Sequence, residues 1–262
     1  MNLEEIAKQV QDLSKETGQF ILSEWNKLSA KDVQTKGLHD FVTHVDQSSE
    51  QKLVKGLRKI IPEAGFIVEE ETTDTKGEKY NWIVDPLDGT TNYIHGITPF
   101  AISIALQKDD KTIFGMVHEL GHNELFYAVE NGPAFLDGEQ IKVSEKSSIK
   151  DSIIATGFPY NDFSRLNEYL KSLDHFMRNS HGIRRLGSAA TDLAYTACGR
   201  FEAFYEYSLK PWDVAAGAFI LKQAGGRVSD FKGKNNYIFG QEIVAASSRV
   251  FDEFLQTIKE YI

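Results

Sequence analysis

The pattern of apolar residues changes near residue 150 of this 262-residue chain. In about residues 100–143, apolar and polar residues alternate, and Asp-Asp, Asn-Gly and Asp-Gly pairs separate the alternating runs. Such a pattern is typical of antiparallel strands joined by tight turns. After residue 150, short apolar runs alternate with longer segments of helical spacing. We therefore predict a mixed α/β (α+β) fold in which layers of helix and sheet pack together.

Amphipathic helices are expected before the first strand. Apolar residues recur at helical spacing over about residues 3–29 and 44–60, and Thr43 or Asp46 can cap the second helix. In the second half we expect, in chain order, the strand SIIATGF, a helix near 162–178, the strand GIRRLG, a helix in SAATDLAYTACG, the strand FEAFYEY, a helix in WDVAAGAFILKQAGG, the strand EIVAASS and a helix in RVFDEFLQTIKEYI.

The two halves are not separated by a linker, a repeat or a low-complexity tract. We therefore expect residues 1–262 to form a single domain, with an N-terminal half of about 1–145 and a C-terminal half of about 146–262.

Composition excludes several classes of function. The net charge is −9, from 38 acidic and 29 basic residues without a long basic run, so we expect no nucleic-acid partner. The longest apolar runs are far shorter than the roughly 20 residues of a membrane span, and the acidic N-terminal segment does not resemble a signal peptide. The single cysteine, Cys198, is expected to be buried in a helix and suits a reducing compartment. We expect a soluble, cytoplasmic protein with no membrane partner.

The segment WIVDPLDGTTNYIHG, residues 82–96, carries the strongest chemical signal. Its first three residues are typical of a buried strand, and Asp85 and Asp88 follow around Pro86. Two carboxylates at a strand end repel each other, so we expect a cation between them. The Asp-Pro-x-Asp-Gly pattern also makes a good turn, and spacing alone leaves a purely structural turn open.

More acids occur at the ends of other predicted elements, namely Glu69 in GFIVEEE and Asp213 in KPWDVAAGAF. Hard oxygen ligands in this number favour Mg²⁺, and paired divalent ions are the usual means of phosphoryl hydrolysis. Gly89, Thr90 and Thr91, at an expected helix start, provide backbone N–H groups for a phosphate. The sequence therefore predicts a metal pair beside a phosphate site.

These segments resemble the signature motifs of the inositol monophosphatase family. WIVDPLDGTTNYIHG is similar to the first motif and WDVAAGAFILKQAGG to the second, in the family's order and separation. The segments KGLHDFVTHVDQ, GFIVEEE and RRLGSAATDLAYTACGRFEAFYE extend the resemblance over nearly the whole chain. The resemblance implies a layered α-β-α-β-α sandwich of the sugar phosphatase type, with an antiparallel-rich sheet in the N-terminal half and a mixed sheet in the C-terminal half.

The resemblance also implies roles for individual residues. The Thr90 hydroxyl, paired with Asp46, would orient and activate the attacking water, and Glu69 would be a further catalytic residue. The implied metal ligands are Glu69, Asp85, the Leu87 carbonyl, Asp88 and Asp213. The implied substrate-binding residues are Asp88, Gly89, Thr90, Gly187, Ser188, Ala189, Glu206 and Asp213.

The implied activity is Mg²⁺-dependent hydrolysis of inositol 1-phosphate by direct attack of a metal-activated water. Two or three Mg²⁺ ions per site, Mn²⁺ as a substitute, inhibition by Li⁺ and a homodimer are family traits to expect. Related phosphatases leave other substrates open: fructose 1,6-bisphosphate, NADP, adenosine 3′,5′-bisphosphate and histidinol phosphate. Thr91 and Asn92 in DGTTN favour the inositol type. A non-catalytic regulatory binding protein is an alternative from a different class.

The acidic pair after the first strand has two readings. Strand alternation predicts that either Glu69 or Glu70 faces the metals, and we prefer Glu69. Val68 stands where the family usually has a glycine, which puts the geometry of Glu69 in question.

The segment HELGH, His118 to His122, matches the H-E-x-x-H pattern of zinc peptidases. That chemistry needs a helix, whereas the flanking residues alternate like strands and Leu-Gly-His-Asn favours a hairpin turn. Arg184, Arg185 and Lys36 are expected to be solvated surface charges rather than contacts to a second phosphate, and Asp40 has no assigned role.

Overall fold

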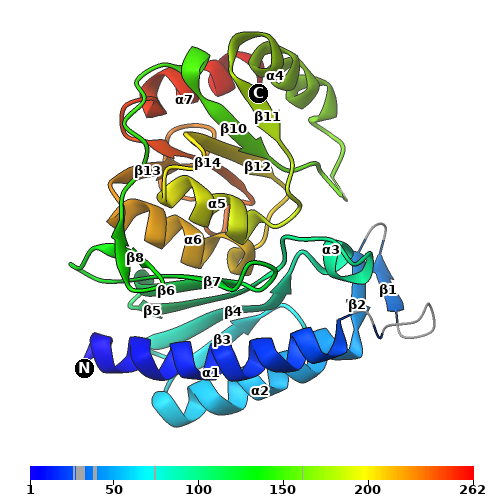
Figure 1. Cartoon of the computed structure of the whole chain (residues 1–262), viewed down its shortest axis with the longest axis vertical. Helices are drawn as coiled ribbons and strands as arrows, with labels where there is room; N and C mark the ends of the chain where they lie inside the picture. Colours follow the sequence, from blue (N-terminus) through cyan, green and yellow to red (C-terminus); the bar gives the residue numbers. More distant parts are fainter. Residues whose placement is uncertain (26, 28–32, 38–39, 74, 161) are drawn as a thin grey trace.

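The computed structural model describes residues 1–25, 27, 33–37, 40–73, 75–160 and 162–262. Helices and sheets alternate in five layers, α-β-α-β-α, along the longest axis of the molecule (Figure 1). The described helices are α1 (Leu3–Glu24), α2 (His44–Ile60), α3 (Thr90–Ile94), the 3-10 helix η1 (Ile149–Asp151), α4 (Leu166–Asn179), α5 (Ala189–Ala197), α6 (Pro211–Gln223) and α7 (Phe251–Tyr261). The layering confirms the predicted fold class.

The first sheet is rich in antiparallel pairs, as predicted. Its described strands lie side by side in chain order, and among them only β3 and β4 run parallel to each other. The strands are β3 (Gly65–Val68), β4 (Tyr80–Asp88), β5 (Ala101–Lys108), β6 (Lys111–Glu119), β7 (Glu124–Val129), β8 (Ala134–Leu136) and β9 (Glu139–Ile141). A separate antiparallel pair, β1 (Val33–Gly37) and β2 (Asp40–Thr43), precedes α2.

The second sheet is mixed and has the spatial order β11-β10-β12-β14-β13. Strand β10 runs parallel to β11 and β12, whereas β14 is antiparallel to β12 and β13. The strands are β10 (Ile153–Thr156), β11 (Gly182–Arg184), β12 (Ala203–Tyr207), β13 (Gly226–Ser229) and β14 (Glu242–Ser247).

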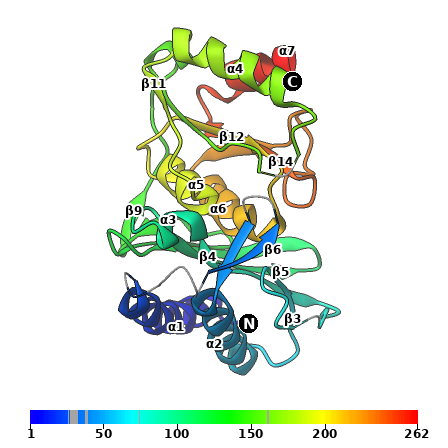
Figure 2. The same ribbon diagram turned by 90° about the vertical axis from the view of Figure 1, so that its right-hand side faces the viewer.

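Side-chain alternation along β4 explains why helices cover both faces of the first sheet. Trp82 and Val84 belong to the core shared with α1 and α2, whereas Ile83 belongs to the core shared with α5 and α6. Figure 2 shows α5 and α6 between the two sheets, with α1 and α2 outside the first sheet. A third core lies under α4 and α7, on the outer face of the second sheet.

Several boundaries differ from the predictions. The predicted helix 3–29 ends at Glu24, where Trp25 takes an extended backbone, and residues 28–29 lie outside the described part of the chain. Strand β3 ends at Val68, and α4 begins about one turn later than predicted. Cys198 is the half-buried C-cap of α5 rather than a buried residue within it. Among the described residues, no helix combines the length and the apolar character that a membrane crossing needs.

Gly115 of β6 lets α6 approach the first sheet closely, because a Cβ atom there would lie 2.7 Å from the Ala216 carbonyl oxygen. We expect Gly115→Ala to lower the free energy of unfolding by about 1–3 kcal/mol, since the backbone of α6 must shift. Urea unfolding measures this loss. The control is Gly132→Ala, whose added methyl would meet the movable Val129 side chain at 3.0 Å and should cost less. Equal losses in both variants would contradict the close-packing explanation.

Candidate active site

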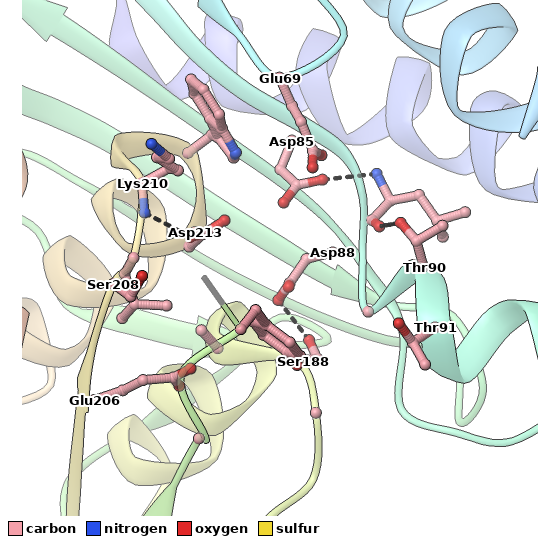
Figure 3. A pocket seen from close by; sticks show the side chains of 18 of the residues that line it. Glu69, Asp85, Asp88, Thr90, Thr91, Ser188, Glu206, Ser208, Lys210 and Asp213 are labelled. Carbon is pink, nitrogen blue, oxygen red and sulfur yellow. Dashed lines mark hydrogen bonds between the residues drawn. The ribbon is translucent and has the colours of Figure 1, made fainter. Parts of the chain in front are cut away.

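A cavity of about 510 Å³ opens where β4, α3, α5, α6 and β12 meet. Figure 3 shows Asp85, Asp88 and Asp213 directed toward one another inside it. Among its described lining residues, only Arg185 and Lys210 are basic, whereas eight are acidic. The acidic residues are Glu69, Glu70, Glu71, Asp85, Asp88, Asp192, Glu206 and Asp213. This excess of negative charge favours a cation as the first ligand of the cavity.

Two of these carboxylates lie at the end of β4. In a regular strand, residues three apart point to opposite faces, but the register of β4 on β5 shifts between Asp85 and Asp88. The shift includes Pro86, which has no N–H to donate to a neighbouring strand. The Leu87 N–H donates to Asp85 Oδ1 at 2.9 Å. Because of this irregularity, both carboxylates reach the same cavity.

A third carboxylate, that of Asp213, reaches the same point from the first turn of α6. The Lys210 N–H donates to Asp213 Oδ2 at 2.7 Å, which fixes the side chain. Oxygen atoms of Asp85, Asp88 and Asp213 all lie within 4.8 Å of one another. Burial raises the pKa of Asp88 to about 6, and burial together with the charge of Asp88 raises the pKa of Asp213 to about 7. Burial, followed by the charge of Glu69, holds the pKa of Asp85 well above its usual range.

Glu69 lies beside this group of three. Its carboxyl is close enough to hydrogen-bond with Asp85, and burial followed by the charge of Asp213 raises its pKa well above the usual range. Glu69 Oε2 is buried and accepts no hydrogen bond. Glu70 also lines the cavity, contrary to the expectation from strand alternation, because the chain bends once β3 has ended at Val68. Glu69 is nevertheless the member of the pair that contacts Asp85.

Thr90 begins α3 and contacts Asp46 of α2. Thr90 Oγ1 lies 3.0 Å from Asp46 Oδ1 and 2.9 Å from the Leu87 carbonyl oxygen, and it can donate its proton to either. Asp46 Oδ2 accepts from the N–H and the hydroxyl of Thr43, at 2.8 and 2.6 Å. Thr43 is therefore the cap of α2, and Asp46 both completes the capping box and pairs with Thr90. Burial raises the pKa of Asp46.

Gly89 takes a left-handed backbone, with φ of 90°, immediately before α3. A Cβ atom there would lie 3.0 Å from the Pro99 carbonyl oxygen and 3.2 Å from that of Gly187. Glycine is therefore required for both the conformation and the close approach of the two loops. The role of Gly89 as a phosphate-binding amide stays a prediction.

The predicted substrate-binding wall lies on the side of the cavity formed by α5 and β12. Glu206 is only 5% exposed, and a Cβ atom at Gly157 would lie 2.0 Å from its carboxylate. Burial, followed by the charge of Asp213, holds the pKa of Glu206 well above its usual range. We call Asp85, Asp88 and Asp213 the acidic group. The Ser188 hydroxyl donates to Asp88 Oδ2 at 2.6 Å, so it orients one carboxylate of this group. The remaining wall residues that line the cavity are Gly187 and Ala189.

Arg185 is a correction to the sequence analysis. It lines the cavity, is half-buried and donates to the Tyr160 hydroxyl, whereas the sequence analysis expected a solvated surface charge. Arg184 is exposed, as expected. The two arginines are adjacent in the sequence, so only their placement around the end of β11 distinguishes them. The side chains of Lys36 and Asp40 lie outside the described part of the structure.

Two further polar residues contribute to the site in ways that spacing did not indicate. Asn92 Nδ2 donates to the Pro99 and Leu186 carbonyl oxygens, each at 2.8 Å, and ties α3 to the loop before α5. Asp192 lines the cavity, and its buried Oδ1 accepts no hydrogen bond. Burial, followed by the charge of Glu206, holds the pKa of Asp192 well above its usual range. Burial of such polar side chains is visible only once the fold is known.

The HELGH segment forms the end of β6 and a turn. Glu119 accepts from the N–H groups of Gly121 and His122 at 2.9 and 2.7 Å, and His118 Nδ1 lies 3.0 Å from Ser14 Oγ. The motif therefore lacks the helix that a zinc peptidase needs, and that alternative is wrong.

The acidic group fits a divalent cation. Its donors are hard carboxylate oxygens, three of them within 4.8 Å of one another, and Glu69 adds a buried oxygen that accepts no hydrogen bond. In their ionised form these groups repel one another, so a cation is the partner that they need at neutral pH. The ligand role of each residue stays a prediction.

Known proteins resemble the chain over nearly its whole length. A model of the inositol monophosphatase family matches residues 2–262. Nus factor SuhB of Pseudomonas aeruginosa is 37% identical over 258 residues, which cover 95% of this chain and 94% of the relative. Extragenic suppressor protein suhB of Bartonella henselae superposes with a TM-score of 0.92 and 34% identity, over 98% of this chain and 99% of that chain. An IMPase of Thermotoga maritima superposes with a TM-score of 0.89 and 31% identity, over 98% of each chain.

The fold, the acidic cavity and these comparisons define a phosphatase, and the family together with the acidic group supports dependence on a metal. The chain belongs to the inositol monophosphatase family.

Removing one carboxylate of the acidic group should stabilise the metal-free protein and weaken its stabilisation by Mg²⁺. We expect Asp85→Asn to raise the melting temperature of the metal-free protein, because one of several repelling charges is lost. The same variant should lose the stabilisation that Mg²⁺ gives the wild type, while its amide oxygen still accepts from the Leu87 N–H. Thermal unfolding in EDTA and in excess Mg²⁺ measures both effects. Asp252→Asn, on the exposed face of α7, is the control, and equal Mg²⁺ stabilisation of all three proteins would contradict the assignment.

The raised pKa values predict how this stabilisation depends on pH. The Asp88 and Asp213 carboxyls both have a pKa of 3.8 in the unfolded chain. In the folded protein without metal, the pKa of Asp88 is about 6 and that of Asp213 is about 7. Their contribution to stability is therefore fully present below about pH 4 and is lost as the pH rises through about 6 to 7. Because protons and cations compete for these oxygens, the Mg²⁺-induced rise in melting temperature should grow over the same range. A rise that is constant between about pH 5 and 8 would contradict this prediction.

Proposed function

We propose that the chain is a Mg²⁺-dependent phosphomonoesterase that hydrolyses inositol 1-phosphate to inositol and phosphate. The observation that carries the proposal is the group of Asp85, Asp88 and Asp213 beside Glu69, in one cavity with Thr90. We infer two or three Mg²⁺ ions per site, with Mn²⁺ as a substitute and Li⁺ as an inhibitor. When bound, such ions would supply positive charge to the phosphoryl oxygens and lower the pKa of a water.

The chain's own residues would orient the attack on phosphorus. Asp46 can accept the Thr90 hydroxyl proton, which leaves the Thr90 oxygen free to accept a hydrogen bond from the attacking water. Asp46 is itself held by the N–H and hydroxyl of Thr43, so this pair is oriented before substrate arrives. Gly89 brings the start of α3 to the cavity, where its N–H groups would hold phosphate oxygens.

The choice of inositol 1-phosphate rests on the side of the cavity formed by α5 and β12. Glu206 and Asp192 present carboxyl groups there, and such groups hydrogen-bond to the hydroxyls of a polyol. Arg185 is the basic residue of this wall. A substrate that places a second phosphate near Arg185 is therefore the main alternative to inositol 1-phosphate. The competing substrates are fructose 1,6-bisphosphate, NADP, adenosine 3′,5′-bisphosphate and histidinol phosphate.

We further propose that the enzyme acts as a cytoplasmic homodimer with neither a nucleic-acid nor a membrane partner. The single cysteine and the net charge of −9 support this setting, and the dimer is an expectation from the family. The names of curated relatives, which are called Nus factors, favour a second candidate function, a regulatory binding role.

Phosphate release from a substrate panel tests the proposal. We expect turnover with Mg²⁺ and none with EDTA, and we expect inositol 1-phosphate to exceed the four competing substrates by about tenfold or more in kcat/KM. Asp85→Asn is the inactive control. If kcat/KM is highest for another compound, the proposed substrate is wrong and the proposed metal site stands. No turnover on the whole panel would favour the regulatory role.

A further inference from the structure

Glu50 is a buried carboxylate that the proposed reaction does not use. It lies on α2 one turn after Asp46, and residues four apart share a helix face. The Glu50 side chain is 0% exposed, and it is not among the described residues that line the cavity. Asp46 and Glu50 are thus two buried carboxylates on one face of α2, and of the two only Asp46 contacts Thr90.

The Glu50 carboxylate accepts three hydrogen bonds from the turn that follows β3. Its Oε2 accepts from the Glu70 N–H at 2.7 Å. Its Oε1 accepts from the Thr72 N–H at 2.9 Å and from the Thr72 hydroxyl at 2.7 Å. Both oxygens are therefore bound to one short segment, residues 70–72. This segment directly follows Glu69, the acid that contacts Asp85.

The turn needs such support for two physical reasons. Glu71 has φ of 53°, a left-handed conformation that is unfavourable for a residue with a Cβ atom. The turn also carries Glu69, whose carboxyl is repelled by the charge of Asp213. A carboxylate that binds two backbone N–H groups opposes both effects, because charge-assisted hydrogen bonds are stronger than neutral ones. An apolar residue at position 50 would pack but would leave these N–H groups without an acceptor.

We propose that Glu50 is a positioning residue: it holds the turn of residues 69–72 so that the Glu69 carboxyl stays beside Asp85 and can serve as a cation ligand. The consequence for metal binding rests on the proposed function. The hydrogen bonds between Glu50 and the turn are present in the metal-free protein. The effect of Glu50 on the turn and its effect on metal binding can therefore be measured separately.

The test compares Glu50→Gln with a matched control, Glu119→Gln. Glu119 is also fully buried and accepts two backbone N–H groups, those of Gly121 and His122, but it holds the turn between β6 and β7. Each glutamine keeps the size of the side chain and replaces one acceptor oxygen by an N–H₂ donor. Both variants should therefore lose stability by comparable mechanisms, while only the first acts on the turn beside the acidic group.

The first readout is binding of Mn²⁺ to the purified protein without substrate, followed by electron paramagnetic resonance. We expect Glu50→Gln to weaken Mn²⁺ binding by about tenfold or more, as loss of an outer hydrogen-bond partner does at metal sites. Glu119→Gln should bind Mn²⁺ like the wild type. In turnover, the Mg²⁺ concentration for half-maximal rate should rise for Glu50→Gln while KM for substrate stays within about twofold. Equal Mn²⁺ binding by the two variants would overturn the proposal.

The second readout is hydrogen–deuterium exchange of the metal-free protein. We expect Glu50→Gln to speed exchange of the 69–73 segment and Glu119→Gln to leave that segment unchanged. If Glu50→Gln does not fold, Thr72→Val removes one of the three hydrogen bonds at an exposed position and should shift both readouts in the same direction. Failure of the wild type to bind Mn²⁺ or to hydrolyse any substrate would contradict the proposed function, and unchanged exchange at 69–73 would overturn the inference about Glu50.

Discussion

The mutual repulsion of buried carboxylates at the end of β4 is the constraint on which the site depends. Each carboxylate of the acidic group is held by a donor that does not belong to the group. The Leu87 N–H holds Asp85, the Ser188 hydroxyl and the Ala190 N–H hold Asp88, and the Lys210 N–H holds Asp213. These hydrogen bonds orient the oxygens toward one another, while burial raises their pKa values. The frame therefore keeps charges together that a cation can neutralise.

This arrangement of carboxylates and their donors requires the two halves of the chain to pack closely against each other. Helix α6 delivers Asp213 from between the two sheets, and it is buried from Val214 to Leu221, which explains why its sequence is apolar on all sides. Glycines at the contacts remove the side chains that would separate the halves, as Gly115 does under α6 and Gly89 does against Gly187. The packing of the interior thus determines the spacing of the acidic group.

Much of the fold could be predicted because periodicity is local. The meander, the alternation of strands and helices and the resemblance of the motifs indicated the layers, and the acids at element ends indicated the cavity. The errors lie where the chain leaves a strand. Arg185 was assigned to the surface because charged side chains are usually solvated, and Glu70 was assigned away from the cavity because strand alternation was extended beyond β3. Both strands end before these residues, and the bends that follow are set by tertiary contacts such as that of Glu50 with Glu70.

The sequence by itself determined which chemistry is available: hard oxygen ligands at three element ends, a glycine before a helix start and a threonine beside it. Its periodicity also indicated that layers of helix and sheet pack together, because burial of apolar faces follows their periodicity, and the family resemblance implied the order of the layers. Only the tertiary structure decided which oxygens meet within 4.8 Å, which arginine enters the cavity and which buried glutamate holds the turn after β3. The physical reason is that hydrogen bonds and charge repulsion act over a few ångströms, between residues that lie far apart along the chain.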